Sequence, residues 1–329
     1  MSKAIGRKFS IGLGKETSRG TAVSSAFWVP KMNLSIDDKI NYAVDESSIG
    51  VIEDAIGQDI TSKFSEGTLE GRVYDKSFGL ILLAAFGTET SSTQVGGETL
   101  VYDHLFNVSE SAQHTSLTIN AVDPNDGTGR QFTLGMIEAL EINVEIGQYL
   151  TYKADFRANA SAQGATTASF TAENGFRPQD GIIKLAANLA GLGAASAISV
   201  KKGTISIKKN LEDDVIIGSV TPADRLNKAF VVEGTLELMY DARTHIDTNL
   251  IGDASQALRV QFANTSVTIG SASNPTITFD LAKIKYQEVA RKMNNNDLIT
   301  QTIKFKAFYS LSDSVMIKAT LRNLQSATY

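Results

Sequence analysis

The stretch ITSKFSEGTLEGRVYDKSFGLILLAAFG, residues 60–87, indicates how this chain folds. Its centre, EGTLE at residues 66–70, returns unchanged at residues 233–237. A tyrosine–aspartate pair follows each copy, as Tyr74-Asp75 and as Tyr240-Asp241. Apolar or aromatic residues precede each copy and a possible helix follows it. The sequence therefore predicts a duplicated unit that consists of a strand and then a helix.

The composition is typical of a folded globular protein. The chain has 329 residues, of which 42% are hydrophobic and 20% are charged, and such a chain can bury a core. This length suits two domains of ordinary size or one large β domain. The formal net charge is −5 and no basic run occurs. A protein that grips nucleic-acid phosphates is therefore not expected.

The sequence offers no signal for export or membrane insertion. The first apolar residues are interrupted by Gly12, Gly14 and Lys15, so no signal-peptide core forms. The most apolar run, residues 80–86, is too short to span a bilayer. Cysteine is absent, which removes disulfides and thiolate chemistry. We expect a soluble protein that is made in a cytoplasm and contacts no membrane.

Residues 1–30 are rich in glycine, serine and threonine. They resemble a phosphate loop only superficially, because Phe9 stands where the first glycine is needed and Glu16 replaces the serine or threonine. We expect an extended arm with turns, held in place by Phe9, Ile11, Phe27 and Trp28.

Two strands are predicted in the first unit. Apolar residues alternate with polar ones over residues 34–44, which is typical of a half-buried strand. A polar loop follows at residues 45–57. In the EGTLE strand, Leu69 and Val73 lie on one face while Thr68 and Glu70 lie on the other. Alternation of this kind indicates a sheet with one buried and one hydrated face.

A buried helix is predicted over residues 76–86, because eleven mostly apolar residues suit a helix better than a strand. Asp75 is its expected N-cap, and Gly87 is expected just beyond its last turn.

The clearest strand pair lies between residues 136 and 156. Leu140 and Ile142 alternate with Glu141 and Asn143, and the same alternation resumes after Gly147. This pattern predicts an antiparallel sheet with charge pairs on its hydrated face. The predicted fold is mainly β, a β-sandwich or partial barrel with a flanking helix.

The order of these elements repeats in the second half of the chain. Ile205 lies 171 residues after Leu34, and Glu233 lies 167 residues after Glu66. A helix is expected over residues 241–252, although it is much more polar than the first. The copies have therefore diverged, or the second helix packs against less.

No arrangement of residues indicates catalysis. His104, His114 and His245 are scattered, and none has a second ligand at metal-binding spacing. A Gly-x-Ser-x-Gly elbow is absent. Adjacent carboxylates such as Asp37-Asp38 point to opposite faces of a strand, which makes them poor acid–base partners. We expect no catalytic, cofactor-binding or metal-binding residues, and no enzyme.

The chain resembles the tail tube (major tail) proteins of long-tailed bacteriophages. An ordered set of short motifs that spans nearly the whole chain carries this resemblance. The motifs are GKET at 14–17 with GTA at 20–22, EGTLEG at 66–71 leading into LILLAAFG, Tyr102-x-His104-x-Phe106 before SLTI at 116–119, FRP at 176–178, and LRN at 321–323.

The resemblance implies a structural protein that assembles with itself into stacked rings around a channel for DNA. Tail terminator, tape measure and baseplate or tip proteins are its implied partners, and its implied location is the virion tail, assembled in the bacterial host cytoplasm. The N-terminal arm and residues 45–57 would contact neighbouring subunits or rings. The arm residues assigned to assembly are Gly14, Glu16, Gly20, Thr21 and Trp28.

We predict three segments: an arm at 1–30, a first tube-like β domain at 31–165 and a second, diverged one at 166–329. A ring of six such units would contain three chains, or six chains if only one unit lines the channel. Two other functions remain open. They are another phage structural component, such as a head decoration or fibre protein, and a β-sandwich carbohydrate-binding module or glycosidase.

Overall fold

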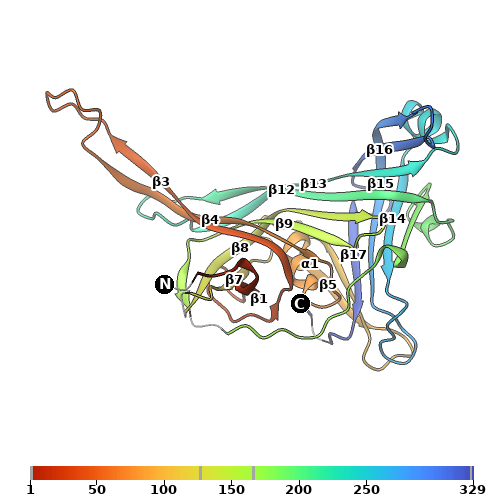
Figure 1. The fold of residues 1–329 in the computed structure, drawn as a ribbon, viewed down its shortest axis with the longest axis horizontal. Helices are drawn as coiled ribbons and strands as arrows, with labels where there is room; N and C mark the ends of the chain where they lie inside the picture. The colour runs from red at the N-terminus through yellow and green to blue at the C-terminus, as the bar shows by residue number, and fades with distance from the viewer. Residues whose placement is uncertain (1–2, 126–127, 165–166, 327) are drawn as a thin grey trace.

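Antiparallel strands dominate the computed structural model (Figure 1), which describes residues 3–125, 128–164, 167–326 and 328–329. The mainly β fold with a flanking helix is therefore confirmed. The strands of the first half of the chain are β1 (Ser10–Lys15), β2 (Phe27–Trp28), β3 (Lys31–Asp45), β4 (Gly57–Arg72), β5 (Gly87–Gln94), β6 (Tyr102–Val108), β7 (Leu117–Val122), β8 (Gly129–Glu145), β9 (Thr151–Ala158) and β10 (Ala162–Gly164). Those of the second half are β11 (Gly181–Ala186), β12 (Val200–Asp214), β13 (Asp224–Met239), β14 (Gln256–Ala263), β15 (Thr276–Lys292), β16 (Thr300–Ala307) and β17 (Ile317–Asn323).

The helical segments are few and short in the described residues. They are the α-helix α1 (Phe78–Phe86), the π-helix η4 (His245–Ile251) and the 3-10 turns η1 (Gly6–Lys8), η2 (Pro178–Asp180) and η3 (Ala190–Leu192).

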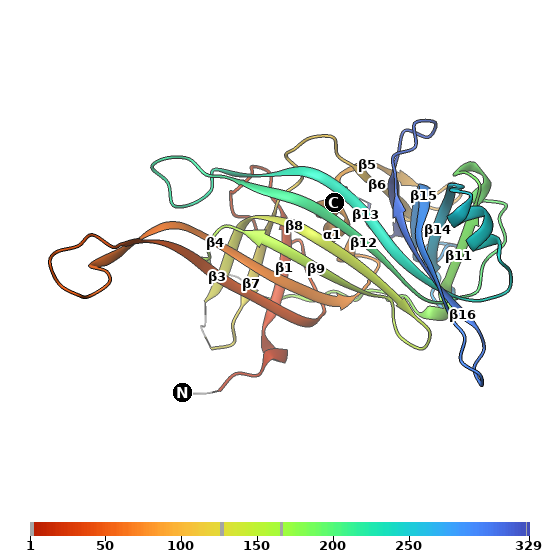
Figure 2. The same ribbon diagram turned by 90° about the horizontal axis from the view of Figure 1, so that it is seen from above.

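The long strands form one layer in which neighbours pair in the order β3–β4–β9–β8–β12–β13–β16–β15. Figure 2 shows these strands side by side from above. The first four come from the first half of the chain and the last four from the second half. Within this layer the halves join through the antiparallel pairing of β8 with β12, and outside it β6 of the first half pairs with β17 of the second. The two units thus share one continuous sheet.

Shorter strands pack on the same side of this layer as α1 (Figure 1). In the first unit, β1 pairs with β2 and β7, while β7 and β10 pair with the beginning of β8. In the second unit, β11 pairs with β14, and β14 and β17 pair with the beginning of β15. Corresponding strands therefore close the same side of the layer in both units.

The helix α1 forms where the apolar run predicts it, and all nine of its residues are buried. It begins two residues later than predicted. Asp75 is not its N-cap, because its carboxylate accepts hydrogen bonds from the backbone and side-chain nitrogens of Asn174. Gly87 ends the helix with φ 91°, as predicted, because a left-handed residue strains any side chain other than glycine.

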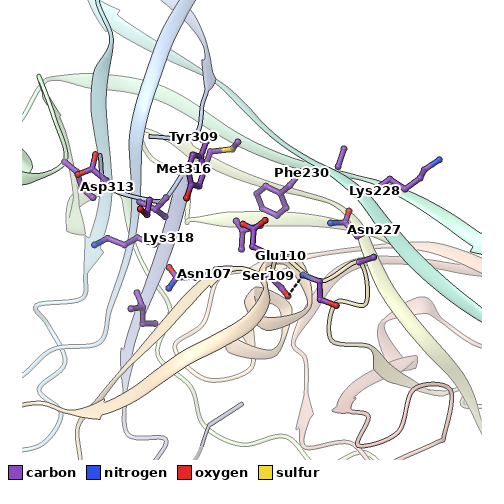
Figure 3. A pocket seen from close by; sticks show the side chains of 18 residues that line it. Asn107, Ser109, Glu110, Asn227, Lys228, Phe230, Tyr309, Asp313, Met316 and Lys318 are labelled. Carbon is purple, nitrogen blue, oxygen red and sulfur yellow. Dashed lines mark hydrogen bonds between the residues drawn. The ribbon is translucent and has the colours of Figure 1, made fainter. Parts of the chain in front are cut away.

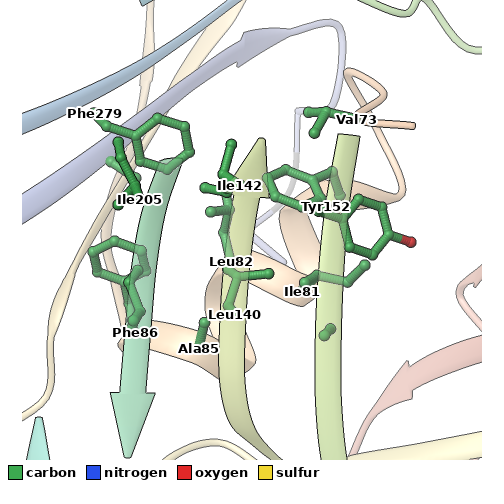
Figure 4. Packing of buried hydrophobic residues seen from close by; sticks show 14 of the residues in the cluster. Val73, Ile81, Leu82, Ala85, Phe86, Leu140, Ile142, Tyr152, Ile205 and Phe279 are labelled. Atoms are coloured by element: carbon green, nitrogen blue, oxygen red, sulfur yellow. The ribbon is translucent and has the colours of Figure 1, made fainter. Parts of the chain in front are cut away.

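The core continues from one unit into the other. Figure 4 shows α1 side chains such as Leu82 and Phe86 beneath Leu140 and Ile142 of β8 and Ile205 of β12. The ring of Phe86 lies 6.1 Å from that of Phe230, a β13 residue, between centroids. Since α1 contacts strands of both units, its apolar surface helps to join them.

The second predicted helix is shorter than expected. Only residues 245–251 are helical, in a π-helix in which Asn249 alone is buried. Of the two expected alternatives, weaker packing is observed: the sequence is polar, and of the residues of η4 only the partly buried Leu250 packs against the core.

The strand predicted over residues 34–44 lies within β3, but its outer half is not half-buried. Ile40, Tyr42 and Val44 are exposed, because β3 and β4 extend beyond the body of the molecule as a projecting hairpin (Figure 1). Their alternation correctly predicts a strand, yet no other part of the described chain covers its apolar face.

Much of the predicted arm is structured within the chain. Ile11 and Leu13 are buried in β1, and Trp28 is buried in β2. The predicted boundary between the two domains, at residues 165 and 166, lies outside the described residues.

Candidate functional site

The main layer ends in two open edges. Among the described residues, β3 pairs only with β4, and β15 from Lys285 to Lys292 pairs only with β16. Unpaired backbone groups on such edges are ready to pair with another chain. The sequence prediction missed β15, although the alternation of Ile277, Phe279 and Leu281 could have indicated its first half.

Two hairpins project from the same end of the molecule in both views (Figures 1 and 2). The tip between β3 and β4 covers residues 46–56, and the tip between β12 and β13 covers residues 215–223. Both tips expose large apolar side chains. These are Ile49, Val51, Ile52 and Ile56 in the first tip and Val215, Ile216, Ile217 and Val220 in the second.

Two turns at the opposite end of the layer also expose apolar side chains. The pairing of Arg72 with Thr151 and of Met239 with Thr300 places the β8–β9 and β15–β16 turns opposite the hairpin tips. Exposed apolar side chains in these two turns are Ile146, Tyr149, Met293 and Leu298. Apolar groups that cluster at both ends are typical of surfaces that contact other proteins.

The predicted arm residues are held by contacts within the chain. The buried carboxylate of Glu16 accepts hydrogen bonds from the backbone of Gly20 (2.7 Å) and Leu134 (2.8 Å) and from the hydroxyls of Ser116 and Thr118. Leu134 has φ 52°, so this bond stabilises a strained backbone. Glu16 thus ties the segment to β7 and β8.

The other four arm residues also lie in this segment. A side chain at Gly14 would meet the Ser24 carbonyl at 2.2 Å, and Gly20 has φ 77°. The Thr21 amide donates to the Ser18 carbonyl, and Trp28 is buried in β2. Their role in contacts between subunits stays a prediction.

A polar cluster joins this segment to the second unit. Arg19 donates to the Asp224 carboxylate, with Nη2 2.6 Å from Oδ1, and to the carbonyl of Arg225. Arg225 is fully buried, contacts Asp213 and donates to the Leu134 carbonyl. Burial alone raises the pKa of Asp224, but hydrogen bonds from Arg19, Arg225 and Gln113 hold it below its ordinary value. Sequence spacing gave no signal for this cluster, because its members are far apart in the chain.

A buried lysine lies at the joint between the units. Lys209 of β12 donates from Nζ to the carbonyl oxygen of Ala84 in α1 at 2.5 Å. Burial, aided by the positive charge of Arg19, lowers the pKa of Lys209 to about 7. Burial, the positive charge of Lys209 and that of Arg19 lower the pKa of His114 to about 4.

The remaining histidines make structural contacts. His104 is buried between Glu89, at 2.7 Å, and the side chain of Asn323, at 3.1 Å. His245 contacts the Tyr286 hydroxyl, and burial lowers the pKa of His245. Within the described part of the chain, no group of three or more His, Cys, Asp or Glu side chains could hold a metal ion.

Figure 3 shows an open pocket of about 800 Å³ beside the joint. Loop residues 109–112, part of β13 and the segment before β17 line it. Ser109 accepts a hydrogen bond from the Ser111 amide, and Asp313 accepts one from the Ser310 hydroxyl. Each contact joins residues two or three apart in the chain, so both stabilise turns.

Comparison with known proteins gives one clear result. The family model for phage tail tube proteins matches residues 6–307. No curated protein matches the chain. A solved structure, a crystal structure of an Hcp protein, is similar at 11% identity and a TM-score of 0.23, over 44% of this chain and 97% of that one.

The described residues contain no helix long and apolar enough to cross a membrane. The family match covers both units, both projecting hairpins and the open edges of the layer. The chain therefore belongs to the phage tail tube protein family, a structural family of the virion tail rather than a class of enzymes.

Proposed function

We propose that copies of this chain close into rings, and that stacked rings form the hollow tail tube through which DNA passes. The observation that carries this proposal is the continuous sheet, whose first strand, β3, and last strand, β15, each leave one edge open. Pairing the β3 edge of one copy with the β15 edge of the next removes both edges, and closing the ring leaves none.

Three chains per ring suit this arrangement. Each chain contributes eight strands to the layer, so three chains would give a barrel of 24 strands. With strands about 4.8 Å apart and tilted by about 40°, its backbone diameter is about 50 Å. Such a barrel is wide enough for a DNA duplex. Both units then line the channel, and six chains are not needed.

The polar face of the layer would line this channel, because α1 and the short strands cover the other face. Several charges on the polar face are paired, in ion pairs such as Lys202–Glu145 (3.1 Å) and Lys304–Glu288 (2.7 Å). Paired charges attract phosphates weakly, so DNA can slide without being held.

Ring stacking would use the two apolar ends. The hairpin tips at 46–56 and 215–223 would contact the β8–β9 and β15–β16 turns of the next ring, which buries apolar surface on both sides. The rings at the two ends of the tube would contact tail terminator and baseplate or tip proteins, and the lumen would hold the tape measure protein. Assembly would take place in the bacterial host cytoplasm.

Electron microscopy of the concentrated, purified chain tests the proposal. Hollow tubes, or rings of three chains, are the expected result. A variant in which a short Gly-Ser turn replaces residues 46–56 keeps the ring edges and should give rings that do not stack. A globular monomer at every concentration, with glycan-binding or hydrolase activity, would overturn the proposal.

A further inference from the structure

The two units pair their strands in the same register, which allows one joint to be predicted from another. Gly67 of β4 lies opposite Ile36 and Phe156, and Gly234 of β13 lies opposite Ile205 and Phe305. A Cβ on Gly67 would come within 2.3 Å of a carbonyl oxygen of β3, and a Cβ on Gly234 would come within 2.3 Å of one of β12. Hence β3 corresponds to β12 and β9 corresponds to β16.

Irregularities in the strands fall at corresponding positions too. Met32 has no partner in the register of β3 with β4, and Lys201 has none in the register of β12 with β13. Each lies four residues before the residue opposite the EGTLE glycine, which is Ile36 in β3 and Ile205 in β12. Likewise, Glu138 is skipped between β8 and β9, and Gln287 between β15 and β16. Since bulges fix register, these matches align the units residue by residue.

Within the main layer, the two units meet where β8 pairs with β12. Lys202 lies opposite Glu145, Ile205 opposite Ile142, and Lys208 opposite Ala139. The strands that correspond to this pair are β15 and β3, and these are the two open edges. The main layer therefore contains one completed joint and the two separate halves of a second.

We propose that β3 of one copy pairs with β15 of the next copy in the register of the internal joint. This places Asn33 opposite Asn294, Ser35 opposite Lys292, and Lys39 opposite Glu288. The proposal rests on ring formation, and it adds the strands, the direction and the residue pairs of the contact.

The charges of the two edges are complementary in this register. The exposed Asp37 of β3 would lie diagonally across from Lys292 of the partner copy, and Lys39 directly across from Glu288. Within one chain, Lys39 lies 3.8 Å from Glu66, and Glu288 lies 2.7 Å from Lys304. The joint would therefore create a row of four alternating charges, and opposite charges on neighbouring strands stabilise their pairing.

The helices support the same contact. At the internal joint, α1 lies beneath the paired strands and receives Lys209 of β12. At the open edge, η4 contacts β15 in the corresponding place, and its Ile251 is 71% exposed. Lys209 corresponds to Ile40 of β3, so the exposed Ile40 of the next copy would lie over η4.

Cysteine pairs test the register directly, because the chain has no cysteine of its own. In the Ser35→Cys/Lys292→Cys variant, opposed positions would be about 4.5–5.5 Å apart between Cα atoms, a separation that a disulfide spans. The matched control is Thr204→Cys/Asn143→Cys, the corresponding pair of the internal joint. A second control, Ser35→Cys/Ala290→Cys, is shifted by two residues and should be too far apart to close.

After oxidation of assembled tubes, non-reducing electrophoresis should show chains joined to one another for the Ser35/Lys292 pair only, with three chains as the largest product. The Thr204/Asn143 pair should close within single chains. Tubes that form but cross-link through the shifted pair, or not at all while the internal control closes, would overturn the proposed register and leave the tube intact. A wild-type chain that never assembles would overturn the proposed function and this joint together.

Discussion

The segments α1 and η4 occupy corresponding places in the two units but differ in almost every contact. The first is an apolar α-helix with all nine residues buried, and it lies under a completed joint between two strands. The second is a π-helix with one buried residue, and it lies beside an edge whose partner strand is missing. Two differences accompany its exposure: the sequence of η4 is more polar than that of α1, and in the described chain no strand pairs with the outer edge of β15 beside it. In the first unit the same chain supplies such a strand, whereas in the second a neighbouring copy would supply it.

The most direct test of this comparison is to shorten one leucine side chain in each helix. Leu82 of α1 is fully buried. Leu82→Ala should lower the unfolding free energy of the protein by about 2–5 kcal/mol, because the substitution leaves a cavity in the core. Leu250→Ala in η4 should cost less than about 1 kcal/mol in the unassembled chain. Urea unfolding of both variants measures the two losses. Equal losses would show that the two helices contribute alike.

The shared glycines of the EGTLE strands test whether the two units are built alike. A Cβ at either Gly67 or Gly234 would lie 2.3 Å from a carbonyl oxygen of the paired strand. Each alanine variant should therefore lose about 1–3 kcal/mol of stability. Gly57→Ala, in the same strand as Gly67 but with open space around it, should change stability little. Thermal unfolding compares the three, and a loss at only one of the shared glycines would contradict the equivalence.

Lys209 tests the polar contact between α1 and the second unit. Its pKa is about 7 in the folded chain and has its ordinary value of 10.5 when unfolded. The unfolded chain binds this proton more tightly, so the unfolding free energy should rise as pH increases from about 7 to 10.5. Below pH 7 the group contributes no further change.

Replacing this lysine should remove that pH dependence. Lys209→Met should be more stable than the wild type near pH 7, by about 1–3 kcal/mol, because a buried charge is replaced by an apolar chain of similar size. Chemical unfolding at pH 7 and pH 9 measures both effects, with the exposed Lys208→Met as control. A wild-type slope that persists in Lys209→Met would rule out this lysine as its source.

The smallest effect is expected at the exposed ion pair of the internal joint. Lys202 and Glu145 are about half exposed, with Nζ and Oε2 3.1 Å apart. Lys202→Ala should lower the unfolding free energy by no more than about 1 kcal/mol, since water screens such pairs. Calorimetry should show a small shift in Tm. A loss as large as that of Leu82→Ala would mean that this ion pair, and not the core beneath it, holds the units together.

Local patterns in the sequence predicted the parts of the fold that depend on local interactions. Alternating residues placed Leu69 and Val73 in the core, and the apolar run with Gly87 located α1. The pairing of β1 with β7 was not predicted, because about a hundred residues separate the two strands. The exposure of Ile40 and Tyr42 was not predicted either, because their alternation indicates a buried face without revealing which molecule covers it.

In the candidate site too, local features were predicted and long-range contacts were missed. Residues 45–57 were predicted as a loop that contacts the next ring, and residues 46–56 form the exposed tip of a hairpin; the contact itself stays a prediction. The edge residues of β15 were missed, because an open edge is a property of strand order, which no local pattern encodes. Arg19, Lys209 and Arg225 were missed for a similar reason, since each acts on groups far away in the chain.

Both hairpins project from the same end of the molecule, so a stack of such rings has a direction. Every added ring presents the same surface as the one before it, and a head-to-tail contact of this kind never closes on itself. Growth therefore has no stopping point that the subunit could specify. In such a stack the subunit itself would not set the length of the polymer.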